Sequence, residues 1–262
     1  MTHAAGKERS RKRHKRHKHT EMKSLVDIIR GLPRPLRNPL YRISRFLVPK
    51  GTAELAFWKA RWAEEGRRFN HDHYPSLMLA MSGEADDSFI DDKVIADFGC
   101  GPRGSLAWAE RARVRLGIDV LATCYADHFA SAINEHGMIY VTNTEDHIPI
   151  GSDSIDILFT LNAIDHVNRF EAICDELLRI LKPGGLFVGS FNLNEPPAPC
   201  EPQSLDEATV KRCLLDRMDV DSYRLSAPGK GSARYEPLLK GRPIPCDPGD
   251  ESVLWVRAKK PR

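Results

Sequence analysis

The chain has 262 residues, 41% of them hydrophobic, which suffices for one full α/β domain with an extension and excludes a wholly disordered protein. The formal net charge is +3, but residues 1–20 hold eight of the 39 basic and one of the 36 acidic residues, leaving 31 and 35 elsewhere. The folded part is therefore slightly acidic, and nothing in its composition indicates a broad basic groove for nucleic acid.

The N-terminal part of the chain is expected to be an extension of the main domain. Residues 1–20 are low in complexity and predict a disordered basic tail, which either contacts RNA or another anionic surface or is only solvated. In 24–49, apolar residues and arginines interrupted by prolines indicate short amphipathic helices that dock on the core or a sister subunit. Glu54–Phe69 predicts a helix whose aromatic face packs against the main domain or lines an acceptor pocket.

From residue 91 onward, short apolar runs alternate with amphipathic stretches, which is typical of a parallel sheet covered by helices. The predicted strands are Val94–Phe98, Val114–Ile118, Met138–Val141, Ile155–Leu161 and Leu186–Ser190. The predicted helices lie at about Ser105–Ala112, Tyr125–His136 and Asn168–Leu181.

The C-terminal part completes this sheet. Ser204 and Glu207 resemble a capping box that opens a helix through Leu215. The runs Val220–Leu225 and Val253–Ala258 predict a closing antiparallel pair. The expected fold is α/β, a Rossmann-like, seven-stranded, mostly parallel sheet with helices on both faces, an antiparallel edge pair and an N-terminal helical extension. We expect three segments: 1–20 as the tail, 21–90 as the extension and 91–262 as the main domain.

The cysteines and the hydrophobic pattern indicate the compartment. The six cysteines form no C-x-x-C pair and no zinc-type spacing. His71-Asp72-His73 has no further ligands near it in sequence, so no metal site is expected. No apolar run approaches the roughly 20 residues that span a bilayer, and we expect a cytoplasmic location with no membrane span.

A glycine-rich segment between the first predicted strand and helix is the most informative motif. It reads Asp97-Phe98-Gly99-Cys100-Gly101-Pro102-Arg103-Gly104, and glycines there let the backbone approach a ligand closely. Asp119 ends the next predicted strand, where a carboxylate can accept hydrogen bonds from a ribose. The glycines alone would also suit a nicotinamide dinucleotide. Asp97 favours another ligand, because a carboxylate there repels a pyrophosphate and attracts an ammonium and a sulfonium.

With these residues the chain resembles the class I S-adenosylmethionine-dependent methyltransferases, and among them the small-molecule group called type 11. The resemblance covers about Val94 to Phe191 and implies S-adenosyl-L-methionine as the cofactor. It matches Asp97, Gly99 and Gly101 to the first motif and Asp119 to the ribose-binding acid. Thr144 and Glu145 fall where the family contacts adenine, although the family often has Asp at the position of Thr144.

Other residues of the expected site depart from the family or follow its fourth strand. Arg103 stands where the family usually has glycine, and it is a candidate partner for the methionine carboxylate. Asn162 is a candidate contact to the cofactor or the acceptor. His166 is the candidate general base, and its alternative role is to cap or pack the following helix. The loop after the fifth strand offers Asn192, Asn194 and Glu195 to a polar acceptor, or is only a rigid connector.

The sequence favours methyl transfer to a small-molecule or saccharide acceptor, with O-methylation weakly preferred. One alternative keeps the enzyme but makes RNA its acceptor, recruited by the basic tail. Another is a cofactor-binding module without catalysis, and a nicotinamide enzyme is the most distant. No motif for base N-methylation or cysteine-dependent carbon methylation is visible, and the sequence gives no indication of the oligomeric state.

Overall fold

The structure is a computed structural model that describes residues 50–197, 201, 203–230 and 233–262. The predicted basic tail and the predicted short helices of 24–49 lie outside these residues. The division of the chain into a tail, an extension and a main domain therefore stays a prediction.

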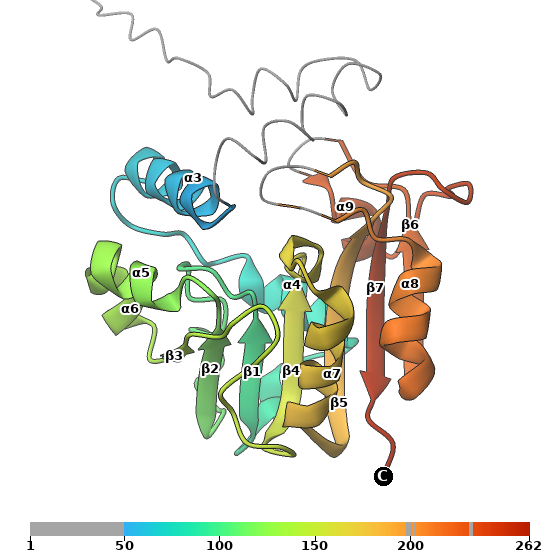
Figure 1. The fold of residues 1–262 in the computed structure, drawn as a ribbon, viewed down its shortest axis with the longest axis horizontal. Coiled ribbons are helices and arrows are strands. Elements are labelled where there is room, and N and C mark those ends of the chain that lie inside the picture. The colour runs from blue at the N-terminus through green and yellow to red at the C-terminus, as the bar shows by residue number, and fades with distance from the viewer. Residues whose placement is uncertain (1–49, 198–200, 202, 231–232) are drawn as a thin grey trace, which may run out of the picture.

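A seven-stranded sheet in the order β3-β2-β1-β4-β5-β7-β6 forms the centre of the molecule (Figure 1). Its strands are β1 (Val94–Phe98), β2 (Val114–Ile118), β3 (Ile139–Val141), β4 (Ile155–Leu161), β5 (Leu181–Leu193), β6 (Asp219–Ser226) and β7 (Ser252–Lys259). The first five strands pair in parallel, whereas β7 pairs antiparallel with both β5 and β6. The predicted fold class is confirmed, including the antiparallel pair at the edge.

Strand β5 is longer than predicted, because its first residue pairs with β4 and its last residues pair with β7. The sequence indicated Leu186–Ser190, the run that is apolar on both faces. In the structure β5 begins at Leu181, which pairs with Ile155 of β4, and it continues to Leu193, which pairs with Ser252 of β7. The extension carries Asn192 to the carboxyl edge of the sheet.

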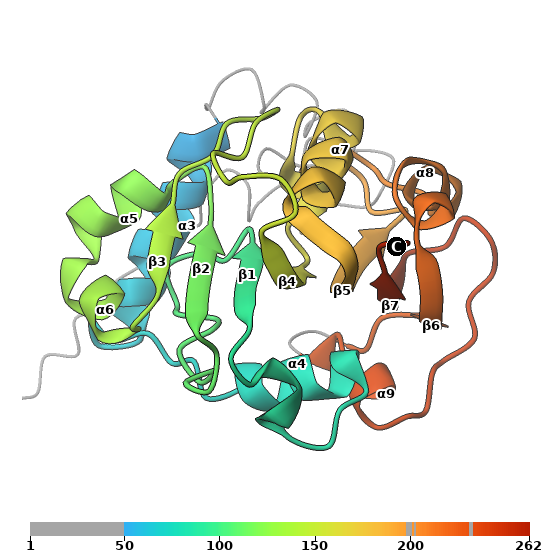
Figure 2. The same cartoon turned by 90° about the horizontal axis from the view of Figure 1, so that it is seen from below.

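Helices cover both faces of the sheet, as the view from below shows (Figure 2). On one face, α7 (Phe170–Ile180) and α8 (Glu207–Cys213) pack on buried residues of β1, β4 and β5. On the other, α4 (Tyr74–Ser82) and α9 (Glu236–Leu239) pack on a second buried cluster that contains the fully buried Trp255. Burial on both sides explains why the central strands read as continuous apolar runs.

The N-terminal helix α3 (Lys50–Glu64) lies over the carboxyl edge of the sheet, beside α5 (Ala122–His128) and α6 (Ala130–Glu135). It ends five residues before the predicted end, and none of its residues is fully buried. Trp58 and Trp62 nevertheless pack against the main domain, as predicted, whereas Phe57 is exposed. The packed residues of this cluster, named here the aromatic cluster, are Leu55, Trp58, Trp62, Phe69, Tyr125 and Phe129.

The predicted helix Ser105–Ala112 is wrong, because the segment forms successive turns. The amide of Ala107 donates to the carbonyl of Gly104, and that of Ala112 donates to Ala109, both three residues back. The Ser105 hydroxyl donates to Asp97, and Leu106 is fully buried. These tertiary contacts outweigh the helical propensity of a short segment. The place of a helix on this side of the sheet is taken by α4, which the sequence analysis missed.

The predicted helix Tyr125–His136 is divided into α5 and α6. The break falls at Phe129, whose backbone leaves the helical region with φ −132° and ψ 31°. Its ring is buried and lies 5.5 Å from the ring of Trp62 and 5.2 Å from that of Phe69, measured between centroids. Packing of one aromatic side chain therefore interrupts the helix.

Helix α8 begins at a different cap from the one predicted. Asp206, not Ser204, precedes the helix, and its carboxylate accepts a hydrogen bond of 2.7 Å from the amide of Thr209. We expect Asp206→Ala to lower the free energy of unfolding by about 1 kcal/mol, because it removes the partner of a helix-terminal amide. Ser204→Ala is the matched control, and because Ser204 is exposed it should change the free energy of unfolding by less than about 0.5 kcal/mol. Denaturant titration measures the free energy of unfolding of both variants. Equal losses in the two variants would indicate that Ser204 also caps the helix.

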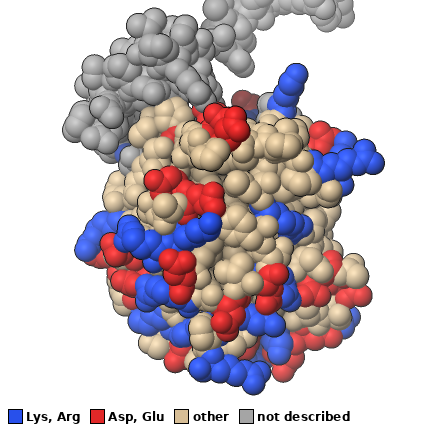
Figure 3. All heavy atoms as spheres, turned by 90° about the vertical axis from the view of Figure 1, so that its right-hand side faces the viewer, with Lys and Arg blue, Asp and Glu red and all other residues tan. Residues whose placement is uncertain are grey.

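Positively and negatively charged side chains are mixed on the molecular face that carries β6 and α8 (Figure 3). On the face shown in Figure 3, lysines and arginines lie among aspartates and glutamates. The elements at this side include ion pairs between Lys211 and Glu207 in α8 and between Arg257 and Asp221 across β6 and β7. Within the residues that the structure describes, no helix is long and apolar enough to cross a membrane.

Candidate cofactor and acceptor site

The glycine-rich turn follows the carboxyl end of β1 and is hydrogen-bonded to the carboxyl end of β2. Gly99 and Gly101 have φ values of +73° and +58°, in the region that favours glycine. The Gly99 amide donates to the carbonyl of Ile118 over 2.7 Å, and the Gly101 amide donates to Asp119 Oδ2 over 3.0 Å. The turn therefore brings the predicted residues Asp97, Gly99, Gly101 and Asp119 together at one edge of the sheet.

Asp97 is the most unusual group at this turn. Its side chain is 1% exposed, and one carboxylate oxygen accepts from the Ser105 hydroxyl. The other oxygen, Oδ1, is buried without a hydrogen-bond partner among the described residues. The pKa of Asp97 is raised to about 7, mainly by burial. The charge of Asp119 also raises this pKa, whereas the hydrogen bond from Ser105 opposes the rise. A bound cation that donates hydrogen bonds would relieve both the missing partner and the repulsion.

Asp119, at the end of β2, is also buried. Its Oδ1 accepts from the Leu121 amide over 2.9 Å, and its Oδ2 accepts from Gly101. Burial raises the pKa of Asp119 as well. Each carboxylate oxygen can accept a second hydrogen bond, so these contacts leave capacity for ligand hydroxyls.

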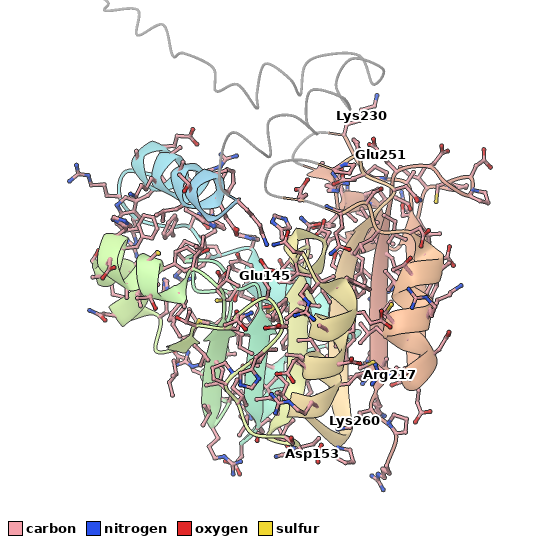
Figure 4. All side chains as sticks on the ribbon, in the orientation of Figure 1. Glu145, Asp153, Arg217, Lys230, Glu251 and Lys260 are labelled. Carbon is pink, nitrogen blue, oxygen red and sulfur yellow. The ribbon has the colours of Figure 1, made fainter. Side chains whose placement is uncertain are left out.

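Glu145 and Thr144 lie in the loop after β3. Glu145 accepts from Lys50 Nζ of α3 over 3.0 Å and from the backbone amide of Asn168 over 2.8 Å. It lies near the carboxyl edge, whereas Asp153 and Lys260 mark the opposite end of the sheet (Figure 4). The Thr144 hydroxyl donates to Asp146 over 3.0 Å within the same loop. Contacts to adenine remain a prediction for both residues.

Glu54 of α3 lies in the same electrostatic environment as Asp119, and no sequence motif indicated a role for it. Burial raises its pKa to about 7, with the charge of Asp119 as the next cause and smaller contributions from Glu145 and Glu201. The helix thus adds a third carboxylate to the region of Asp97 and Asp119. Its position in sequence, outside the glycine motif, gave no signal.

Arg103 is already paired within the protein. Its guanidinium forms an ion pair with Glu65 and donates to the carbonyl of Asn70 over 2.7 Å. Its Cζ lies 5.8 Å from the ring centroid of Trp58 and 5.7 Å from that of Phe69. Arg103 therefore links the glycine turn to the aromatic cluster, and its contact to a cofactor carboxylate stays a prediction.

The loop after β4 brings Asn162 and His166 to the same edge. Asn162 has φ +49°, and its Oδ1 is buried without a partner among the described residues. His166 ends the short helix η2 (Ile164–His166), and its Nε2 lies 3.6 Å from Glu201 Oε1 and 3.9 Å from Asp165 Oδ1. Burial lowers the pKa of His166 against the opposing charge of Glu201. A lowered pKa favours the neutral imidazole, which is the form able to accept a proton.

Polar groups on β5 and the β6–β7 connection contact one another at the same edge of the sheet. Arg234 Nε donates to Asn192 Oδ1 over 3.0 Å, and Arg234 also pairs with Glu195. Asn194 instead donates to the carbonyl of Asp250 over 2.9 Å and holds the β6–β7 connection. The ring of Tyr235 lies 6.0 Å from that of Trp255, and burial raises the pKa of Tyr235 to about 12. Neither Arg234 nor Tyr235 belongs to a sequence motif.

Unpartnered hydrogen-bonding atoms collect along this edge of the sheet. Among the described residues, buried side-chain atoms without a partner occur at or after the carboxyl ends of β3, β1, β4 and β5: Asn143 Oδ1, Asp97 Oδ1, Thr160 Oγ1, Asn162 Oδ1, Asp165 Oδ1 and Ser190 Oγ. Most of them are acceptors only. Such atoms are costly without partners, so the edge is suited to a ligand rich in donors. No group of three His, Cys, Asp or Glu side chains within the described ranges is arranged to hold a metal ion.

Comparisons with known proteins concern the family and the fold. A family model described as a methyltransferase domain matches residues 96–189. An uncharacterized methyltransferase of Mycolicibacterium vanbaalenii is 33% identical over 120 residues, which are 44% of this chain and 47% of that protein. The chain thus spans about half the length of this curated relative.

Solved structures share the fold at low identity. A Haloferax volcanii protein described as a methyltransferase, solved with the Trm112 methyltransferase activator, superposes with a TM-score of 0.54 at 16% identity, over 77% of this chain and 96% of that one. A Bacillus halodurans protein, also described as a methyltransferase, gives a TM-score of 0.54 at 13% identity, over 74% and 100%.

Proposed function

This chain carries a class I S-adenosylmethionine-dependent methyltransferase domain, as its motifs indicated, and from that premise we propose that it methylates a hydroxyl group of a small-molecule or saccharide acceptor. The observation that carries the proposal is the buried, half-partnered carboxylate of Asp97 beside the glycine turn. It suits the ammonium of S-adenosylmethionine and would repel a dinucleotide pyrophosphate. The bound cofactor supplies a methyl group already activated by its sulfonium.

The residues of the cofactor side have separate tasks in this proposal. Asp97 holds the ammonium, and the backbone of Gly99 and Gly101 allows close approach of the ligand. Asp119 accepts the ribose hydroxyls, and the loop of Thr144 and Glu145 borders the adenine. α3 covers this side and limits the access of water, which favours displacement at an activated carbon.

The acceptor side favours a hydroxylated ligand. Asn162, Asp165 and Ser190 present buried oxygen atoms without partners among the described residues, and hydroxyl groups can donate to all of them. His166 takes the proton of the reacting hydroxyl, and the nearby carboxylates of Asp165 and Glu201 stabilise the imidazolium that results. The RNA alternative depends on residues 1–20, outside the described part of the chain, and no described feature favours it.

The proposal is tested in two steps. Calorimetry should detect binding of S-adenosylhomocysteine and no binding of NADH. Binding of NADH without binding of S-adenosylhomocysteine would instead indicate a nicotinamide enzyme. Release of S-adenosylhomocysteine is then measured with panels of sugars, hydroxylated small molecules and RNA. Tight binding of the cofactor with no turnover on any panel would favour a module without catalysis.

We expect His166→Ala to reduce kcat on the identified acceptor by at least about tenfold, the lower range for loss of a general base. The affinity for S-adenosylhomocysteine should change by less than twofold, because His166 lies on the acceptor side. His128→Ala removes an exposed imidazole on α5 and is the control. An unchanged kcat in His166→Ala would remove this residue from the mechanism.

A further inference from the structure

The indole of Trp58 lies directly against the glycine turn. A Cβ atom added to Gly101 would come within 2.8 Å of Trp58 Cζ2, so the ring occupies the space beside the bare backbone of this glycine. Trp58 Nε1 is buried and has no hydrogen-bond partner among the described residues. An indole N–H can only donate, and it usually finds an acceptor when buried.

One hydrogen-bond acceptor and one hydrogen-bond donor, both without a partner among the described residues, therefore flank the glycine turn. Asp97 Oδ1, from the strand before it, lacks a donor, and Trp58 Nε1, on the side of Gly101, lacks an acceptor. An α-amino acid group carries an ammonium that donates and a carboxylate that accepts. The pair thus matches the charge and hydrogen-bonding pattern of an amino acid end group.

We propose that Trp58 Nε1 binds the carboxylate of the methionine part of S-adenosylmethionine while Asp97 binds its ammonium, an assignment that rests on the proposed function. Trp58 lies on α3, outside the matched residues 96–189. The extension therefore completes the cofactor site rather than only covering it.

The surroundings of Arg103 support this division of roles. Its guanidinium is taken by Glu65 and the carbonyl of Asn70, which leaves it poorly placed to serve as the carboxylate ligand. Because it lies over the ring of Trp58, it is a positioning residue that holds the indole against Gly101. This contact with Trp58 gives a structural explanation for Arg103 at a position where the family usually has glycine.

The test uses Trp58→Phe, which keeps an aromatic ring and removes the N–H. Calorimetry compares S-adenosylhomocysteine with 5′-methylthioadenosine, which lacks the amino acid group. We expect about tenfold weaker binding of the first ligand, as for loss of a hydrogen bond to a charged group, and less than twofold change for the second. Trp62→Phe is the control, because Trp62 belongs to the same helix and aromatic cluster, whereas the three atoms nearest to an added Gly101 Cβ all belong to Trp58.

A second measurement does not depend on the variant folding well. The unmodified chain should bind the decarboxylated analogue of S-adenosylhomocysteine about tenfold more weakly, and Trp58→Phe should cause no further loss with this ligand. An unchanged affinity of Trp58→Phe for S-adenosylhomocysteine, or an equal loss with methylthioadenosine, overturns the assignment. If the unmodified chain binds none of the three ligands, the proposed function fails and this inference fails with it.

Discussion

Replacing Asp97 with asparagine is expected to weaken binding of S-adenosylhomocysteine about 100-fold, because loss of one partner of a buried, hydrogen-bonded charge pair costs roughly 2–5 kcal/mol. Asparagine has the same shape and can still accept from the Ser105 hydroxyl. The loss of affinity therefore measures the effect of the negative charge of Asp97 and not of its packing. Calorimetry at pH 8 measures it directly.

The same variant should not destabilise the free protein. The pKa of Asp97 is raised from 3.8 to about 7 in the folded chain. Between about pH 4 and pH 7 the unfolded chain releases this proton more readily, so folding stability falls as the pH rises through that window. Asparagine does not titrate, and above pH 7 the unliganded variant should melt at the same temperature as the unmodified chain or higher.

The affinity for the ligand should rise with pH as Asp97 ionises, whereas the folding stability of the free protein falls. The ammonium requires the ionised carboxylate, so affinity should fall about tenfold from pH 8 to pH 6 and the fall should flatten in Asp97→Asn. Glu54 titrates in the same range and will leave a residual slope. Asp119, Tyr74 and Cys100 also lie in the electrostatic environment of Asp97, but the pKa values of Tyr74 and Cys100 are raised by burial and both stay neutral here.

Asp153→Asn is the control for these measurements. Asp153 pairs with Lys260 at the opposite end of the sheet and has no contact with the glycine turn. Its affinity for S-adenosylhomocysteine should equal that of the unmodified chain. If Asp97→Asn also bound normally, the charge argument for the methyl donor would be lost.

The central strands were predictable because burial on both faces leaves a direct pattern in the sequence. Val94–Phe98, Val114–Ile118 and Ile155–Leu161 have the predicted bounds, and β3 begins one residue later than predicted. The full length of β5 was not readable, since its extension beyond Ser190 pairs with β7, more than 50 residues away in the chain. Long-range pairing of this kind has no local signal.

The helices were harder to predict because tertiary contacts decide several of them. The turns of 105–112 and the break at Phe129 follow from burial of single side chains. Helix α4 is mostly apolar and lacks the amphipathic period, although Pro75 in its first turn and Gly83 after its end are recognised helix signals. Those two residues could have revealed it.

The grouping of residues around the glycine turn could be predicted from the motif. Asp97, Gly99, Gly101 and Asp119 lie at the carboxyl ends of the adjacent parallel strands β1 and β2, so the sheet brings them together. Trp58, Glu54 and Arg234 reach the site from elements whose docking the sequence does not specify. Their contribution became visible only through contacts and burial.

Gly99→Ala is expected to lower the free energy of unfolding by roughly 2–5 kcal/mol and to impair binding of S-adenosylhomocysteine. Part of the loss is the cost of φ +73° for a residue with a side chain, about 1–2 kcal/mol. The rest comes from overlap, because the new Cβ would lie 2.0 Å from Ala163 Cβ in the loop after β4. Overpacking of a close contact costs about 1–3 kcal/mol.

A matched glycine separates the two causes. Gly83 has φ +70° but no atom within 4 Å of an added Cβ, so Gly83→Ala should lose only about 1–2 kcal/mol and bind the ligand normally. Removing the opposing Cβ should rescue the overlap: Gly99→Ala with Ala163→Gly is expected to be about 1–3 kcal/mol more stable than the sum of the two single changes. Additive losses would show that the turn does not press against Ala163. The coupling therefore tests directly whether the glycine turn and the loop carrying Asn162 and His166 form one rigid unit, which cofactor and acceptor must share.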